Sequence, residues 1–132
     1  MRLRKRILEL VNMGFFKVVP LSRVNYGPIG PHPMGSYEVW CPREHFPRAF
    51  SFFTLYRSGL TVLVHPLTRE EVVDHSTRAV WMGTPAPVDL TALSKQLPKV
   101  PAQYPELGLG YSIPGRCDAK YKEDFSNEDD AF

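Results

Sequence analysis

Proline is placed so that only the first part of this chain can form regular elements. The sequence holds 13 prolines, and a proline inside a helix or a central strand removes a backbone donor and breaks the element. Six of them follow Gly83 at short intervals, namely Pro85, Pro87, Pro98, Pro101, Pro105 and Pro114. We therefore expect one folded domain over residues 1–83, an irregular segment that wraps it over 84–115, and a disordered acidic tail over 116–132.

The composition is that of a single cytoplasmic domain without a membrane or nucleic-acid partner. The chain has 132 residues, of which 43% are hydrophobic, enough for one core. Four basic residues open the chain, a pattern more typical of a solvated helix face than of a nucleic-acid-binding face. Glu9 and Asn12 interrupt the apolar residues that follow, so we expect neither a secretory signal nor a membrane span.

Cys41 and Cys117 lack a CxxC spacing and are expected to be reduced.

Two amphipathic helices are predicted from apolar residues at helical spacing. The first covers residues 2–13 and stops at Gly14. Its apolar side consists of Leu3, Ile7, Leu10 and Val11. The second begins near Pro47, which a first turn tolerates, and stops at Gly59. Its predicted core stripe consists of Phe46, Ala49, Phe50, Phe53 and Tyr56 or Arg57.

Three strands are predicted from β-branched and alternating residues. Residues 15–19 form a short strand that ends at Pro20. Residues 36–41 alternate, so that Tyr37, Val39 and Cys41 share one face and Glu38 lies on the other. Residues 60–64 are almost continuously apolar, which is typical of a strand that is covered on both faces.

Three of the four histidines stand at the ends of these elements. His32 lies in a stiff Gly-Pro-His-Pro loop, His65 follows the strand at 60–64, and His75 lies in or beside a short helical turn over residues 68–80, opened by a capping box. A single buried histidine most often caps a turn or satisfies a loop carbonyl, because both ring nitrogens need partners. Three within 44 residues instead indicate convergence on one metal centre.

These residue types match a mononuclear non-haem iron site. Such a site uses two or three imidazoles, often with a carboxylate, and leaves positions open for substrate and dioxygen. The predicted metal ligands are His32, His65 and His75. Glu38 is the candidate carboxylate, although a glutamate in the middle of a strand is as often solvent-facing. Asp74 and the carbonyl groups held by Pro33 and Pro66 are expected to orient the rings.

The order of these segments resembles the DOPA 4,5-dioxygenase family of fungi and bacteria. The residues that carry the resemblance are IGPHPMGSYEV at 29–39, a helix ending in Arg57, GLTVLVHP at 59–66 and DHSTRAVWMG at 74–83. The resemblance covers about residues 1–83 and implies a ferredoxin-like α+β fold of the βαββαβ type, usually dimeric. It also implies extradiol cleavage of a catechol such as L-DOPA by dioxygen, with Fe(II) or another divalent metal as cofactor.

The resemblance bears on the three histidines, and the residue types themselves suggest roles for Glu38 and Arg57. His32, His65 and His75 match family histidines, and which of them is a ligand and which an acid or base stays open. His32 and Glu38 are the predicted catalytic pair. Arg57 is the predicted substrate contact, through its planar fork, although an arginine at the end of a helix more often complements the helix dipole.

The chain departs from the family pattern at its start. Family members begin with a strand that carries a His-x-His-x-Tyr-Phe motif, whereas this chain starts in the helix that follows it. We therefore expect a ferredoxin-like domain lacking its first strand, with weak or no dioxygenase activity because at least one ligand is absent. A smaller departure is Ser58, where the family has glycine.

Two other interpretations stay open. The chain could be a non-catalytic dimeric binding module, or an inactive relative of the dioxygenase, that uses the same α+β surface without metal. It could also be a truncated gene product whose true start lies upstream, in which case the protein in the cell is an ordinary enzyme.

Overall fold

The computed structural model describes residues 2–15 and 19–101 of the chain. The regular elements follow in the order α1 (Arg2–Asn12), β1 (Val19–Asn25), β2 (Ser36–Trp40), α2 (Phe46–Tyr56), β3 (Val62–Val64), α3 (Glu71–Asp74) and β4 (Val80–Met82). Two short 3-10 helices, η1 (Arg43–His45) and η2 (Leu90–Ala92), accompany them. The mixture of helices and strands confirms the predicted α+β class.

The described strands form two antiparallel pairs, β1 with β2 and β3 with β4. In the first pair Val24 lies opposite Tyr37, and the register shifts between Pro20 and Val24. The prediction that the strand ends at Pro20 is wrong, because β1 runs through this proline to Asn25. Among the described strands β1 pairs only with β2, and an edge strand accommodates a proline that has no N–H to donate.

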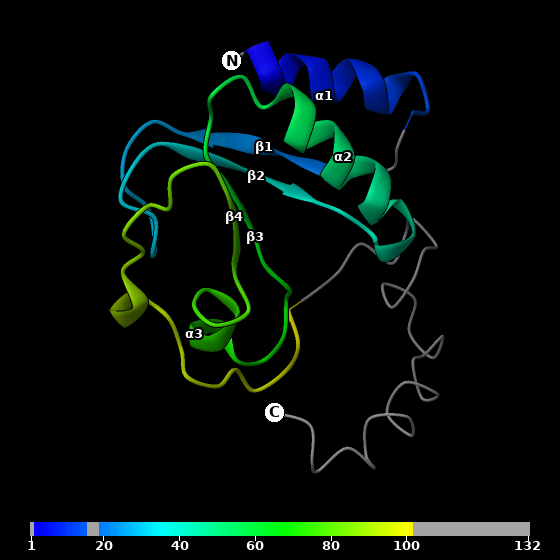
Figure 1. Cartoon of the computed structure of the whole chain (residues 1–132). Helices are drawn as coiled ribbons and strands as arrows, with labels where there is room; N and C mark the ends of the chain where they lie inside the picture. Colours follow the sequence, from blue (N-terminus) through cyan, green and yellow to red (C-terminus); the bar gives the residue numbers. More distant parts are fainter. Residues whose placement is uncertain (1, 16–18, 102–132) are drawn as a thin grey trace.

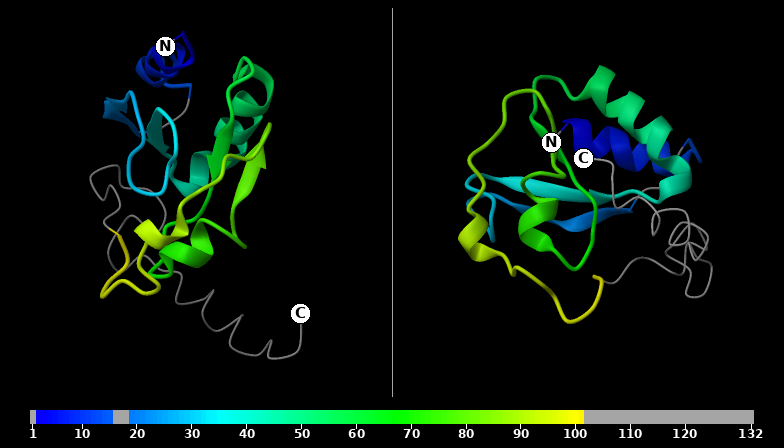
Figure 2. Two further views of the ribbon diagram at one scale, coloured as in Figure 1. Left: turned by 90° about the vertical axis from the view of Figure 1, so that its left-hand side faces the viewer. Right: turned by 60° about the horizontal axis from the view of Figure 1, so that its bottom comes forward.

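The hydrophobic core lies between the two long helices and one face of the β1–β2 pair. Figures 1 and 2 show α1 and α2 on the same side of these strands. The buried residues of this cluster are Leu3, Ile7, Leu10, Ala49 and Phe52. Tyr37, Val39 and Cys41 pack against it, as their alternation in the sequence predicts. Glu38 points away from the core and is exposed.

Both long helices end where glycine predicts. Gly14 adopts a φ of 74°, and the amides of Gly14 and Phe15 donate to the carbonyls of Val11 and Leu10, which is a Schellman motif. Gly59, with a φ of 77°, follows α2. Ser58 is also left-handed, with a φ of 51°, a conformation in which a side chain is strained and glycine is not.

The predicted core stripe of α2 is correct at Ala49 and Phe53, which lie in or against the core, but it omits Phe52 and wrongly includes Phe46 and Tyr56. Ala49 and Phe52 are its buried residues, whereas Phe46 and Tyr56 are 43% and 60% exposed. The sequence could not set this phase, because α2 carries aromatic residues on several sides. Phe52 faces the core because it packs in one cluster with the buried residues of α1.

The segment from 60 to 83 differs from its prediction in three respects. β3 covers only residues 62–64, and these are half-buried rather than enclosed on both faces. Residues 80–82 form β4, opposite β3, instead of the apolar side of a helical turn. The capping box is wrong as well: Glu70 precedes α3 without a side-chain cap, and the Thr68 hydroxyl bonds the carboxylate of Asp74 and the amide of Glu70.

The described part of the proline-rich segment, residues 84–101, is irregular apart from η2. It runs around α3 and the β1–β2 loop in Figure 1. Residues 102–115 and the predicted tail 116–132 lie outside the described residues, and the division into three segments stays a prediction. Within residues 2–15 and 19–101, no helix has the length and apolar character needed to cross a bilayer.

Candidate metal and catechol site

The fold brings the three predicted histidines together. The ring centroids of His65 and His75 are 4.0 Å apart, and those of His32 and His75 are 6.0 Å apart. His65 directly follows β3, His75 is the residue after α3, and His32 lies in the loop between β1 and β2. Three separate elements therefore end at one place, with His75 in the middle of the ring cluster.

Two of the rings are oriented by backbone carbonyl groups. Nδ1 of His65 lies 2.8 Å from the carbonyl oxygen of Pro66, and Nδ1 of His75 lies 2.9 Å from that of Glu71. A carbonyl oxygen only accepts hydrogen bonds, so each Nδ1 carries the proton. The neutral ring then presents the lone pair of Nε2, the form in which an imidazole binds a metal. The predicted orienting role of the Pro66 carbonyl agrees with this geometry.

Two backbone hydrogen bonds close the loop that carries His32, and a third connects this loop to the irregular segment. The amides of Ile29 and His32 each donate to the other residue's carbonyl, at 3.0 and 2.9 Å. Gly30 lies in the turn between them with a φ of 51°, which favours glycine. The amide of Asp89 donates to the carbonyl of Pro31 at 2.8 Å. The irregular segment thus fixes the loop that presents His32.

The same irregular segment also forms hydrogen bonds with α3 and with Arg69, which precedes α3. The amide of Leu97 donates to the carbonyl of Arg69 at 2.7 Å, and the guanidinium of Arg69 donates back to the carbonyl of Leu97 at 2.8 Å. The amide of Ser94 donates to the carboxylate of Glu71 at 2.9 Å. One segment therefore connects the His32 loop with α3.

Burial and neighbouring charges favour neutral rings at this site. Desolvation lowers the pKa of His65, and the Pro66 hydrogen bond opposes this only in part. Desolvation and the neighbouring His75 lower the pKa of His32, whereas the charge of Glu38 raises it. Glu38 is therefore close enough to act on His32 through its charge; the catalytic role of this pair stays a prediction.

Among the described residues, the hydrogen-bond partners of Asp74 are Thr68 and Arg78 rather than the ring of His75, so Asp74 does not orient that ring directly. Its carboxylate is 2% exposed and accepts hydrogen bonds from the amide and hydroxyl of Thr68 and from Arg78. Burial alone would raise the pKa of Asp74, but the bonds from Thr68 and Arg78 outweigh it and hold the pKa below its ordinary value. Sequence reasoning missed this group; Arg78 four residues after Asp74 was the available signal.

The described residues do not complete a ligand set. Within residues 2–15 and 19–101, no three His, Cys, Asp or Glu side chains are arranged so that they could hold a metal ion together. The pair His65 and His75 has the donor chemistry of a metal site, since both rings direct Nε2 away from their carbonyl partners. His32 is a neighbour of this pair, and its role as a ligand stays a prediction.

Arg57 lies apart from the histidines. It ends α2, and one guanidinium nitrogen lies 3.7 Å from the point that a Cβ on Gly83 would occupy. Gly83 follows Met82, which pairs with Val62 at the start of β3, whereas His65 follows the other end of β3. The structure therefore places Arg57 and His65 at opposite ends of the β3–β4 pair, and the role of Arg57 as a substrate contact stays a prediction.

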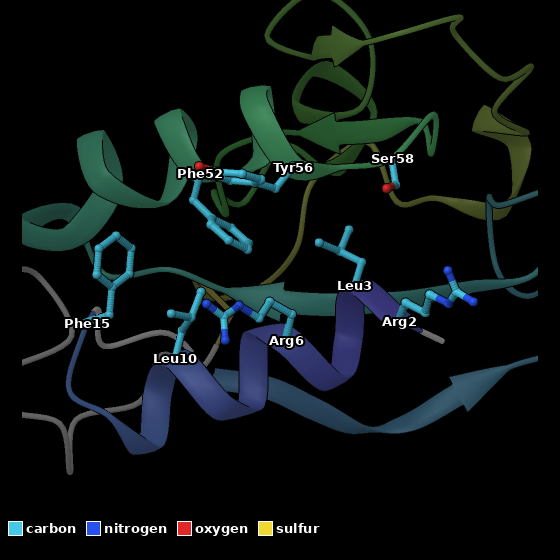
Figure 3. A pocket seen from close by; sticks show the side chains of 8 residues that line it. All are labelled: Arg2, Leu3, Arg6, Leu10, Phe15, Phe52, Tyr56 and Ser58. Atoms are coloured by element: carbon cyan, nitrogen blue, oxygen red, sulfur yellow. The ribbon is translucent and has the colours of Figure 1, made fainter.

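A groove of about 430 Å³ lies elsewhere, between α1 and α2 (Figure 3). Its lining residues are Arg2, Leu3, Arg6, Leu10, Phe15, Phe52, Tyr56 and Ser58. None of these side chains is an imidazole, a carboxylate or a thiol, the usual protein ligands of a transition metal. The chemistry of the three rings, rather than the size of a hollow, therefore locates the candidate site.

Acidification is expected to lower the free energy of unfolding of the metal-free chain. The pKa values of His32 and His65 lie below the ordinary 6.5 in the folded chain, so the unfolded chain binds protons first as pH falls. The two histidines make their full contribution to the free energy of unfolding above pH 6.5. This contribution is lost as the pH falls from there through the lowered pKa values. Urea unfolding on both sides of this window measures the loss, and an undiminished pH dependence in a His32→Asn, His65→Asn double variant would contradict it.

Cys41 is expected to react slowly with thiol reagents. Burial raises the pKa of this thiol to about 11, so about one molecule in a thousand is thiolate at about pH 8. In a Cys117→Ser background, the disulfide reagent DTNB should therefore modify the native chain at least ~10-fold more slowly than the urea-unfolded chain. Equal rates in the two states would show that folding does not protect Cys41.

Known sequences match this chain over most of its length. The profile of the Dopa 4,5-dioxygenase family matches residues 1–92. A DOPA 4,5-dioxygenase of Amanita muscaria is 49% identical over 112 residues, which are 85% of this chain and 49% of that protein. A 21.2 kDa protein of Botryotinia fuckeliana is 38% identical over 77 residues, which are 52% of this chain and 42% of that protein. The chain spans about half the length of the curated relatives it matches.

A solved structure supports the fold. The crystal structure of a candidate dioxygenase from Nostoc punctiforme superposes with a TM-score of 0.60 at 32% identity, over 67% of this chain and 76% of that one. This agrees with the predicted ferredoxin-like α+β fold. Because the family profile covers more than half of the sequence, the chain belongs to the Dopa 4,5-dioxygenase family.

Proposed function

We propose that this chain cleaves the ring of a catechol such as L-DOPA by the extradiol route, with a mononuclear Fe(II) bound at the histidine cluster. The observation that carries the proposal is the meeting of three imidazoles from three elements, two of them with Nδ1 held by a carbonyl group. Membership of the family supports the substrate class. The Amanita muscaria relative is a DOPA 4,5-dioxygenase by name.

The residues at the site fit such a metal in part. His65 and His75 would hold it through Nε2, and His32 would either complete the set or act on the substrate. When bound, iron supplies a Lewis acid with open positions for the catechol oxygens and dioxygen. Another divalent metal would use the same imidazoles.

The protein's own contribution is proton transfer and orientation. His32 is half-buried with a lowered pKa, so it is neutral near pH 7 and able to accept a proton from a catechol hydroxyl group. The charge of Glu38 stabilises the imidazolium that forms. His32 can return this proton when the ring opens. His32 and Glu38 are therefore the proposed catalytic pair.

The test is to reconstitute the 132-residue chain anaerobically with Fe(II), count bound iron per chain, and follow L-DOPA with oxygen by absorbance. We expect bound iron and slow ring cleavage that a chelator stops, because only three of the four described imidazoles lie at the site. Iron binding without cleavage of L-DOPA or simpler catechols would overturn the enzymatic part of the proposal. Failure to bind any divalent metal would overturn the site itself.

A non-catalytic catechol-binding module is the second candidate function. The observation in its favour is that no three donors among the described residues converge on a metal position. In that case catechol binding should need no metal, and a His65→Ala, His75→Ala double variant should bind catechol as well as the unaltered chain. Loss of catechol binding on adding chelator would exclude this candidate.

Two statements about the protein's context stay predictions. One is that the chain forms a homodimer, as the family resemblance implies. The other is that it works in the cytoplasm. Both would leave the chemistry of the histidine cluster unchanged.

A further inference from the structure

A buried carboxylate joins the two segments that carry His65 and His75. Oδ2 of Asp74 accepts the backbone amide of Thr68 at 2.7 Å, and the Thr68 hydroxyl lies 2.9 and 3.0 Å from the two carboxylate oxygens. Arg78 donates to Oδ1 from the outer side at 2.9 Å. Asp74 adjoins His75, and Thr68 lies three residues after His65. The carboxylate therefore spans the short loop between the two rings.

The remaining bonds of Thr68 leave this contact little freedom. Its hydroxyl oxygen accepts the amide of Glu70 at 3.1 Å and a guanidinium N–H of Arg78 at 3.2 Å. Its own proton is thus directed to Asp74, which is 2% exposed and accepts only hydrogen bonds when ionised. A carboxylate removed from water and held by several donors is costly to disturb. The group is a rigid bridge rather than a surface ion pair.

We propose that Asp74 is a positioning residue, whose carboxylate holds Thr68 and thereby fixes the place of the His65 ring relative to His75. The separation of 4.0 Å between the ring centroids follows from this bridge together with the Pro66 and Glu71 carbonyl bonds. Without the bridge the loop at 66–70 is free to shift, and the ring of His65 moves relative to that of His75. The part of this inference that concerns metal affinity rests on the proposed function. The part that concerns the positions of the two rings does not.

The test compares four variants at the bridge with one control in the core. Asp74→Asn keeps the shape of the side chain but removes its charge and one acceptor oxygen, and Thr68→Val removes the hydroxyl. Thr68→Ser keeps the hydroxyl and should rescue. Glu70→Gln weakens the other ion pair of Arg78, which lies at the surface with an N–O distance of 2.7 Å, and leaves the bridge to Asp74 intact.

The metal-free readout is the nuclear Overhauser effect between the ring protons of His65 and His75, measured well below each variant's unfolding temperature. We expect Asp74→Asn and Thr68→Val to reduce it at least twofold, because the effect falls steeply with distance, and Thr68→Ser and Glu70→Gln to keep it. Ile7→Val, in the distant core, is the control for lost stability alone. If Asp74→Asn does not fold, the result for Thr68→Val alone tests the positioning role.

The metal readout is affinity for Co(II), measured by competition with a chelating dye. We expect Asp74→Asn to bind Co(II) about 10–100-fold more weakly, the usual cost of losing a group that orients a ligand. Unchanged ring contacts and Co(II) affinity in folded Asp74→Asn would overturn the inference, as would equal losses in Ile7→Val. If the unaltered chain binds no Co(II) but the ring contacts still depend on Asp74, the proposed function fails and the positioning role stands.

Discussion

Replacing His75 with alanine is expected to abolish measurable iron binding and to lower any L-DOPA turnover by about 100-fold or more. Loss of a group that only orients a ligand costs about 10–100-fold, and removal of the ligand itself should exceed this. His75 is the critical ring because it is the neighbour of both others, 4.0 Å from His65 and 6.0 Å from His32. Its loss removes the ring that neighbours both of the others.

The fourth histidine supplies the matched control. His45 lies at the end of η1, at the start of α2, so His45→Ala removes an imidazole from a different part of the molecule. Iron content should then match the unaltered chain. Far-UV circular dichroism checks that both variants are folded, since His75 also ends α3. Full iron content in folded His75→Ala would remove the basis of the proposed site.

Glu38→Gln separates the metal-binding role from the proton-transfer role. Glu38 is exposed on β2, and its charge raises the pKa of His32, whereas it is not among the groups that shift the pKa of His65. The variant is therefore expected to keep most of its iron and to lose turnover. This pattern is the opposite of a ligand loss, in which both fall together.

Local sequence signals were enough to place the histidines. Each of His32, His65 and His75 stands where a proline or a helix end fixes the backbone. The ends of neighbouring helices and strands tend to lie at one edge of a fold, so residues at such ends tend to lie close together. The helix stops at Gly14 and Gly59 and the alternation along residues 36–41 were equally local, because each depends on the dihedral angles or the faces of one element.

The errors concern contacts between elements. Pro20 ends a central strand but not an edge strand, so the extent of β1 depends on its neighbours. The three residues of β4 are too few to show alternation, and they form a strand because β3 lies beside them. Asp74 next to His75 looked like a partner of that ring. Its true partners, Thr68 and Arg78, are set by how α3 packs on the preceding loop.

Phe52→Ala is expected to destabilise the chain by about 3–5 kcal/mol, the usual cost of removing a large aromatic side chain from a core. Phe52 is 6% exposed and belongs to the cluster that holds α1 against α2. Its ring lies 5.6 Å from that of Phe53 and 5.3 Å from that of Tyr56, between centroids. Since a domain has a total stability of about 5–15 kcal/mol, much of the chain should unfold at moderate temperature.

Two further variants of α2 are controls for the loss of stability in Phe52→Ala. Leu55 is 72% exposed, so Leu55→Ala should change the free energy of unfolding by no more than about 0.5 kcal/mol. Phe52→Leu keeps much of the buried volume and should cost about 1.5 kcal/mol or less. Urea unfolding gives all three values. If Phe52→Ala cost no more than Leu55→Ala, α1 and α2 would not be held together by this core, because the cavity left by a ring inside a packed cluster cannot be without cost.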